Sequence, residues 1–455
     1  MARTCVILVA GLDAHLFASA TGGAGGGASL PTLGAMPWHA AYRPAFPAVT
    51  CTAQATLTTG VSAERHGIIC NGLYTHGRPE LDAHLDLSNH ADARRNVSFW
   101  EQSNTLLQAP RFWQAAGFPK KKTAMLFWQN SMRGAADIVL TPKPEHTPDG
   151  KTLTACWSDP PNLYAELTAA LGPFPLHNYW SPMAGLPSSQ WIAKAAMHVW
   201  RAHAPDLQLV YIPHLDFNLQ RLGPEHPAMI KELQDVDALL GPLAEQVRAD
   251  GGCVVILGDY GMHEVSRPIL PNVALRKAGL LVPKTDAAGK LLVDYERSAA
   301  FVMADHQVAF VYCRPEKQPE VLAVLERLEG VDRIAVGREQ MAALGVGTPR
   351  AGSAALLARP EAWFAHDWWL SDDEKPRWQF SVDIHNKPGF DPRELFFDPV
   401  KKCIAQDPHV VKGSHGLTTD SARWPLIFSD HVPQNAGAPL EATDIAGLIA
   451  AELLR

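Results

Sequence analysis

At 455 residues the chain is roughly three times the length of a typical domain, so it could form one large α/β core with insertions or several domains. With 47% hydrophobic and 19% charged residues, and without an apolar run of roughly 18 residues, it is excluded from the disordered, coiled-coil and membrane-spanning classes. The 40 Lys and Arg against 47 Asp and Glu give a net charge of −7 with no long basic block. We therefore expect a small substrate, with neither a nucleic-acid polymer nor a membrane as partner.

The numbers and spacing of the cysteines and histidines indicate the cellular compartment and the type of chemistry to expect. The seven cysteines are scattered, odd in number and never spaced as C-x-x-C, which favours neither a disulfide framework nor a zinc knuckle. The apolar run at residues 5–10 is too short for a signal peptide and lacks an A-x-A cleavage site. We therefore expect a cytoplasmic protein. The 19 histidines exceed what core packing needs and suggest metal or acid/base chemistry.

Apolar runs alternate with helical periodicity along most of the chain, which is typical of strands buried on both faces of a parallel sheet. Strands are expected at 5–10, 123–128, 207–212 and 253–257, and helices at 163–171, 189–203, 229–249 and 442–454. The predicted fold class is α/β, a mostly parallel, doubly wound central sheet flanked by helices. In such folds ligands bind outside the carboxyl ends of the strands, so polar residues that follow those runs are the candidates.

The stretch 293–369 has a different pattern. Strands are predicted at 306–312, 333–336 and 352–357, with helices at 319–328 and 338–344. This is a compact α+β unit, interpreted as a cap inserted into the core. The predicted domains are thus a core of residues 1–292 and 370–455 and a small α+β cap of residues 293–369.

The segment from Phe46 to Asn71 is the richest in chemistry. Thr50 ends an extended, Pro-containing stretch and opens a helix, which is typical of an N-cap residue. Its hydroxyl would then lie where backbone N–H groups and the helix dipole attract an anion such as phosphate. Taken alone, the segment fits a plain capped helix equally well.

The pattern T-x(8)-T-G, followed by H-G-I and N, resembles the nucleophile region of the nucleotide pyrophosphatase/phosphodiesterase branch of the alkaline phosphatase superfamily. The resemblance implies that Thr50 is the nucleophile and that Asn71 helps to hold a phosphoryl oxygen. It covers residues 1–275 and 376–455 in matching order. It also implies an alkaline-phosphatase-like core and one or two divalent metals, with zinc expected.

Two strand ends carry the next candidates. His214 and Asp216 are two residues apart, so they would share one face if the strand at 207–212 extended this far. By resemblance Asp216 is the Asp of the first metal, but Gln220 stands where the family has His. In Gly258-Asp-Tyr-Gly-Met-His263 the family's pattern implies Asp259 as a ligand of the second metal, with Tyr260 in place of His.

The remaining ligand positions are mixed. Lys412-Gly-Ser-His-Gly416 resembles the family's Gly-x-His-Gly, so His415 takes the role of the last histidine of the first metal. Ala10 stands where the family has an Asp of the second metal. Side chains that could fill the gaps are Asp13, His214, His263 and the His385 of Asp383 to Gly389, while Gln220 and Tyr260 are possible substitutes at the altered positions.

These features predict a metal-dependent hydrolase of phosphodiester or nucleotide pyrophosphate bonds in a small molecule, acting through a phospho-threonine on Thr50. The alternatives are a phosphonate or phosphomonoester hydrolase of the same fold, or a metal-poor protein that binds a phosphorylated small molecule without turning it over. The segments 99–104, 305–307 and 383–388 also resemble a bacterial subgroup of the superfamily, which implies no substrate.

Overall fold

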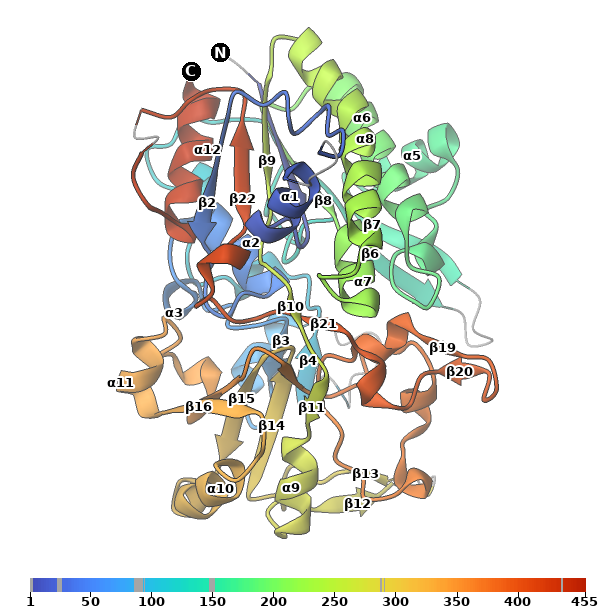
Figure 1. Ribbon diagram of the computed structural model, residues 1–455, viewed down its shortest axis with the longest axis vertical. Coiled ribbons are helices and arrows are strands. Elements are labelled where there is room, and N and C mark those ends of the chain that lie inside the picture. The colour runs from blue at the N-terminus through green and yellow to red at the C-terminus, as the bar shows by residue number, and fades with distance from the viewer. Residues whose placement is uncertain are drawn as a thin grey trace.

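The computed structural model of the chain describes residues 3–22, 27–85, 93, 95–146, 152–286, 289, 291–434 and 437–455. Two lobes are visible in Figure 1. The upper one contains both ends of the described chain and a large sheet, and the lower one contains the segments coloured yellow and orange. None of the helices in these ranges combines the length and apolar character that crossing a membrane requires.

A nine-stranded sheet forms the centre of the upper lobe, in the order β23-β2-β22-β9-β1-β8-β5-β6-β7. From β9 to β6 neighbouring strands pair in parallel, whereas β22 is antiparallel to both of its neighbours and β7 is antiparallel to β6. The predicted mostly parallel sheet is confirmed. Its strands are β1 (Thr4–Val9), β2 (Trp38–Arg43), β5 (Thr123–Leu126), β6 (Ile138–His146), β7 (Thr152–Asp159), β8 (Leu207–Ile212), β9 (Cys253–Leu257), β22 (Leu426–Ser429) and β23 (Leu440–Glu441).

Helices pack on the sheet in two groups. Helices α1 (Ala14–Thr21), α6 (Leu186–His203) and α8 (Ala228–Ala249) form one contact group, and α2 (Thr50–Thr59) and α12 (Ile445–Leu454) form the other. In Figure 1 the two groups lie to either side of β9. Helix α5 (Leu163–Leu171) packs on α6, and α7 (His214–Leu222) packs on α8.

The continuous apolar runs predict the central strands well because these strands are buried on both faces. Every residue of β1, β8 and β9 is buried. The predicted helix at 163–171 coincides with α5. The predicted helix at 442–454 begins instead with a 3₁₀ turn at Ala442–Asp444, and α12 proper starts at Ile445.

The lower lobe contains a second sheet in the order β14-β15-β17-β16, in which all neighbours are antiparallel. Five of its elements lie close to the predicted ranges: β15 (Val308–Cys313), α10 (Gln318–Leu325), β16 (Val331–Val336), α11 (Gly337–Ala342) and β17 (Ala354–Ala358). The edge strand β14 (Ala300–Asp305) was not predicted. Its hydrophobic core also includes Leu275 and Leu280 from before residue 293 and Phe390 and Leu417 from after residue 369. Segments on both sides of the predicted cap thus contribute to this lobe.

Specific contacts join the lobes where the site is formed. Arg350, in a 3₁₀ turn at Pro349–Ala351, donates through Nη1 to the carbonyls of Gly67 (2.9 Å) and Leu106 (2.7 Å). The strands β10 (His263–Glu264) and β21 (Gly413–Ser414) pair with each other although they are far apart in the sequence. The backbone N–H of Gln307 donates to the carbonyl of His415 (2.9 Å). This junction brings the ends of β8 and β9, the start of α2 and the cap together.

Candidate active site

Thr50 is the first residue of α2 and is buried. The N-cap position is Val49, whose side chain makes no capping hydrogen bond, so the prediction that Thr50 is itself the cap is wrong by one residue. As a result the Thr50 hydroxyl is not used for capping. It lies 3.5 Å from the Tyr260 hydroxyl and also forms a hydrogen bond with Tyr211. A helix start whose N-cap side chain makes no hydrogen bond is suited to an anion.

Asn71 is held beside the start of α2. Its Oδ1 accepts from the backbone N–H of Cys51 (2.9 Å), while its own N–H and Nδ2 donate to the carboxylate of Asp305 (2.7 and 3.1 Å). Asp305 ends β14 in the cap. The sequence does not predict the contact between Asp305 and Asn71, because the two residues are more than 230 positions apart. The segment 305–307 resembles a bacterial subgroup, but that resemblance assigns no role to Asp305. The cap therefore orients Asn71 toward the helix start.

Asp216 lies at the start of α7, not on a strand. Because β8 ends at Ile212, the prediction that His214 and Asp216 share one strand face is wrong. Gln220, one helical turn beyond Asp216, donates through Nε2 to Asp216 Oδ2 (2.6 Å). His214 instead points to α8, where its Nε2 is 2.6 Å from Glu232 Oε2.

His415 lies against Asp216 and Tyr260. Its Nδ1 is 2.7 Å from the carbonyl of Ala48, which requires Nδ1 to be the donor. Its Nε2, left with a lone pair, lies 3.9 Å from Asp216 Oδ1. Burial, reinforced by the nearby charge of His306, lowers the pKa of His415 well below its usual value, so the ring is neutral. His415 Nε2 and Asp216 Oδ1 thus face each other as two electron-pair donors with no proton between them.

Tyr260 occupies the centre of this group. Its hydroxyl donates to Asp216 Oδ1 (3.1 Å), and its ring stacks on that of His415 with centroids 3.5 Å apart and planes 6° apart. On the other side of His415 lies the ring of His306, 3.7 Å away, which stacks in turn on Phe390 at 3.7 Å. His306 is buried, and its Nδ1 is 2.7 Å from Asp305 Oδ1.

Asp259 follows β9 and is held by backbone groups. The N–H groups of Gly11 (3.1 Å) and Tyr260 (3.0 Å) donate to its Oδ1, while its buried Oδ2 has no hydrogen-bond partner in the described part of the chain. Gly258 and Gly261 bracket this turn. A Cβ would lie 2.0 Å from the carbonyl oxygen of Leu12 at Gly258 and 1.7 Å from that of Arg423 at Gly261. The close backbone approach therefore excludes any side chain at either glycine.

Burial dominates the electrostatics of the carboxylates. It raises the pKa of Asp216 to about 6 and the pKa of Asp259 well above its usual value. For Asp216 the hydrogen bonds from Gln220 and Tyr260 oppose this shift. A buried carboxylate is costly unless a cation compensates it.

The residues present fit one divalent cation better than two. The carboxylate of Asp216 and the facing Nε2 of His415 offer two donors, and the buried Oε1 of Gln220 has no hydrogen-bond partner in the described residues. At the second position Asp259 Oδ2 faces no other ligand: Ala10 has none to offer, and Tyr260 places a phenol where an imidazole would stand. In the described residues, no three His, Cys, Asp or Glu ligand atoms here lie within 4.8 Å of one another.

The other candidate ligands have structural partners or lie on loops. Asp13 caps α1, accepting from the N–H groups of Leu16 (2.7 Å) and Met262 (3.2 Å), and burial raises its pKa to about 7. His263 lies on β10, where burial lowers its pKa to about 4. His385 is half-buried in the loop that follows the 3₁₀ turn Arg377–Phe380.

An aromatic pocket adjoins the site. Its walls include Trp100, Trp180 and Phe390, and its polar edge is formed by Lys387, Asp391 and Glu394. Phe390 links the pocket to the site because it stacks on His306, which contacts His415. The walls already contact one another: the ring centroid of Phe390 lies 6.2 Å from that of Trp100 and 5.7 Å from that of Trp180.

Comparisons with known proteins agree with this arrangement. Residues 4–391 match the family model described as type I phosphodiesterase/nucleotide pyrophosphatase. Venom phosphodiesterase 2 of Crotalus adamanteus is 25% identical over 238 residues, covering 50% of this chain and 23% of that protein. Ectonucleotide pyrophosphatase/phosphodiesterase family member 3 of Bos taurus is 22% identical over 232 residues, covering 50% and 21%. The matched region thus spans less than a quarter of these relatives' length.

Solved structures share the fold over nearly the whole chain. Murine ectonucleotide pyrophosphatase/phosphodiesterase 5 superposes with a TM-score of 0.60 at 16% identity, covering 99% of this chain and 95% of that one. Phosphonoacetate hydrolase from Sinorhizobium meliloti, in complex with phosphonoacetate, superposes with a TM-score of 0.63 at 15% identity, covering 99% and 96%. The likeness confirms the predicted alkaline-phosphatase-like α/β fold. The chain belongs to the type I phosphodiesterase/nucleotide pyrophosphatase family.

Proposed function

We propose that the protein is a metal-dependent hydrolase that cleaves a phosphodiester or nucleotide pyrophosphate bond in a small molecule through a covalent phospho-threonine on Thr50. The observation that carries the proposal is the convergence of Thr50, at an uncapped helix start, with Asn71 and the Asp216–His415 pair. Each residue type matches the chemistry that phosphoryl transfer requires: a nucleophile, donors for the equatorial oxygens and ligands for a cation.

Thr50 Oγ1 would attack phosphorus in line, forming the Oγ1–P bond as the bond to the leaving oxygen breaks. The second Nδ2 hydrogen of Asn71 would bind a phosphoryl oxygen beside the start of α2, whose Cys51 N–H already donates to Asn71 Oδ1. Bound by Asp216, Gln220 and His415, a divalent cation such as zinc would supply charge neutralisation and lower the pKa of the attacking hydroxyl.

The proton of Thr50 has a hydrogen-bonded path. The Thr50 hydroxyl is 3.5 Å from that of Tyr260, which donates to Asp216 Oδ1 at 3.1 Å. Water would then hydrolyse the phospho-threonine and regenerate the hydroxyl. In this proposal Tyr260 takes over part of the role that a second cation would have.

A nucleotide is one class of substrate that fits the family. The named relatives are phosphodiesterases and nucleotide pyrophosphatases, and an inactive variant of the murine family member 5 was solved in complex with AMP. For the present chain a nucleotide substrate, zinc as the metal and a cytoplasmic location are parts of the proposal.

A second candidate is a protein that binds a phosphorylated small molecule with little or no turnover. The observation that favours it is the loss of ligands around Asp259, where Ala10 and Tyr260 leave one unpartnered carboxylate oxygen. Hydrolysis of a phosphonate or a phosphomonoester is a third outcome within the same fold.

One experiment separates these functions. The purified protein is assayed against nitrophenyl phosphodiesters, nucleotide pyrophosphates, phosphomonoesters and phosphonates with zinc or manganese, beside elemental analysis. We expect metal-dependent turnover of a diester or pyrophosphate with about one equivalent of metal in the active site. No bound metal, and no activity on adding it, would support the binding protein instead.

A further inference from the structure

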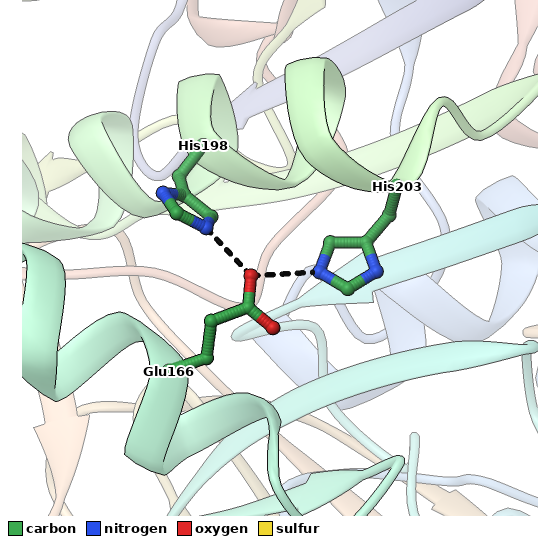
Figure 2. A group of neighbouring side chains, drawn as sticks. All are labelled: Glu166, His198 and His203. Carbon is green, nitrogen blue, oxygen red and sulfur yellow. Dashed lines mark hydrogen bonds and ion pairs between the residues drawn. The ribbon is translucent and has the colours of Figure 1, made fainter.

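Helices α5 and α6 hold a cluster of ligand-type side chains away from the candidate active site. Glu166, in the first turn of α5, lies between His198 and His203 near the end of α6 (Figure 2). Its Oε1 is 2.6 Å from His198 Nε2 and 3.1 Å from His203 Nε2. Both imidazoles thus converge on a single carboxylate oxygen.

The cluster lies toward the opposite end of the sheet from the active site. His203 ends α6, and the chain enters β8 four residues later at Leu207, whereas Asp216 follows the other end of β8. Six strand residues at about 3.3 Å each separate the two ends by roughly 20 Å. The phosphoryl chemistry proposed for Thr50 makes no use of these three side chains.

We propose that Glu166, His198 and His203 bind one divalent transition-metal ion, zinc being the best fit, independently of the active site. Their ligand atoms all lie within 4.8 Å of one another, and two imidazole nitrogens with one carboxylate oxygen form a donor set that zinc favours. The side chains are 33%, 28% and 21% exposed, so a water molecule can complete a tetrahedral shell.

The geometry needs only a small adjustment. Ligand atoms about 2.0–2.1 Å from a tetrahedral zinc lie roughly 3.4 Å apart, against 2.6 and 3.1 Å here. The Nε2 protons that now bridge to Glu166 would be displaced, and the carboxylate oxygen would move about 0.8 Å from His198 Nε2 and about 0.3 Å from His203 Nε2. The bound ion would tie α5 to α6 in place of the two hydrogen bonds.

A second group with ligand-type side chains fits a metal less well. Cys253, His431 and Glu452 also lie within 4.8 Å of one another, but Arg455 is 3.1 Å from the Glu452 carboxylate. Burial, together with the nearby charge of Glu452, raises the pKa of the Cys253 thiol to about 12, so the thiolate that a metal needs is disfavoured. The α5–α6 cluster has neither obstacle.

The test is metal binding by the full chain after removal of metal and dialysis against zinc. We expect the His198→Ala/His203→Ala variant to hold one equivalent fewer than the wild type and to lose part of the zinc-dependent rise in Tm, with hydrolytic activity unchanged. The exposed pair His226→Ala/His409→Ala is the matched control and should keep the wild-type stoichiometry.

A second variant covers the case in which the double variant fails to fold. Glu166→Gln keeps hydrogen-bond partners for both histidines but replaces the carboxylate with a poor zinc ligand, so zinc affinity at this site should fall about tenfold or more. The visible absorption of bound Co²⁺ should lose the component from this site in the same variant. Equal stoichiometry, affinity and Co²⁺ spectra in wild type and Glu166→Gln would overturn the proposal.

Discussion

The phenol ring of Tyr260 lies flat on the imidazole of His415, with ring centroids 3.5 Å apart and an interplanar angle of 6°. The same phenol donates its hydroxyl hydrogen to Asp216. In the family pattern a histidine stands at this position and helps to bind the second metal. Tyr260 therefore connects the Asp216–His415 pair to Thr50 while leaving Asp259 without a second ligand. Under the proposed function, the number of metals in the site would depend on this side chain together with Ala10.

Restoring the missing ligands should restore the second metal. In the double variant Ala10→Asp/Tyr260→His, a carboxylate and an imidazole join Asp259, whose Oδ2 is buried without a partner in the described residues. We expect active-site metal to rise from about one to about two equivalents, and diesterase activity to rise about tenfold or more. Elemental analysis and steady-state kinetics at saturating zinc measure both quantities.

Tyr260→Phe is the control for this variant. It keeps the ring on His415 but loses the hydroxyl contacts to Asp216 and Thr50, so activity should fall while active-site metal stays at about one equivalent. If the restored variant bound no more metal than Tyr260→Phe, the interpretation of Tyr260 as the residue that blocks the second site would be wrong.

Replacing the nucleophile tests the covalent step. Thr50→Ala should lower kcat for a nitrophenyl phosphodiester by about a thousandfold or more, because the remaining groups bind the phosphoryl oxygens without attacking phosphorus. Metal content should be unchanged because Thr50 is not a ligand. Thr59→Ala, at the other end of α2, should keep near-normal activity since its hydroxyl bonds only to backbone groups, donating to the Ala55 carbonyl and accepting from the Val61 N–H. Full turnover by Thr50→Ala would contradict the proposed covalent mechanism.

The sequence predicts those parts of the fold whose pattern is local. β1, β8 and β9 appear as continuous apolar runs because both faces of each strand are buried. By contrast β6 and β7 include Pro142, Glu145 and Asp159, and their pairing is irregular, so they carry no such pattern. The sequence does not show where β8 ends, because α7 starts at His214, directly after its N-cap residue Pro213.

The candidate site also has one part that local sequence patterns predict and another that they do not. Thr50, Asn71, Asp216, Asp259 and His415 could be proposed from motifs that each lie within a few residues of sequence. The contacts of Asn71 with Asp305, and of His415 with His306, join the core to the cap and depend on the fold as a whole. The hydrogen bond from Gln220 to Asp216 likewise forms only because a helix, and not a strand, follows β8.

A buried ion-pair network supports the wall of the aromatic pocket. Arg393 is fully buried and contacts Asp367 through Nη1 (2.9 Å) and Nη2 (2.5 Å) and Asp391 through Nε (2.6 Å). Burial acts to raise the pKa of Asp391, but the charges of Arg393 and Lys387 hold it well below its usual value.

Arg393→Met should therefore lower the free energy of unfolding by about 3–5 kcal/mol, because the buried Asp367 loses the Arg393 cation and Asp391 keeps only Lys387. Chemical denaturation followed by fluorescence gives the value. Lys317→Ala, which removes an exposed ion pair with Glu320, should change stability little. A loss in Arg393→Met no greater than that in Lys317→Ala would show that Lys387 compensates the network alone.

His66 should make the protein less stable in mild acid. The residue is fully buried, its Nδ1 accepts from the N–H of Ile68 (3.1 Å), and its Nε2 is 3.0 Å from Thr56 Oγ1, so both nitrogens of the neutral ring are occupied. Burial, reinforced by the charges of Arg111 and Arg350, lowers its pKa to about 3. The unfolded chain binds a proton near pH 6.5 and the folded chain does not, so stability rises with pH across this window.

The expected slope from this group is at most about 1.4 kcal/mol per pH unit between pH 6.5 and 3, with stability falling as pH falls. His66→Asn keeps an acceptor for the Ile68 N–H but cannot titrate. Its free energy of unfolding should therefore be lower overall, but should fall less steeply than that of the wild type as the pH is lowered. Urea unfolding of both proteins from pH 7 to pH 4 gives the difference, in which the buried carboxylates common to both cancel. Parallel curves for the two proteins would mean that His66 is protonated in the folded state and that its buried contacts do not exclude the proton.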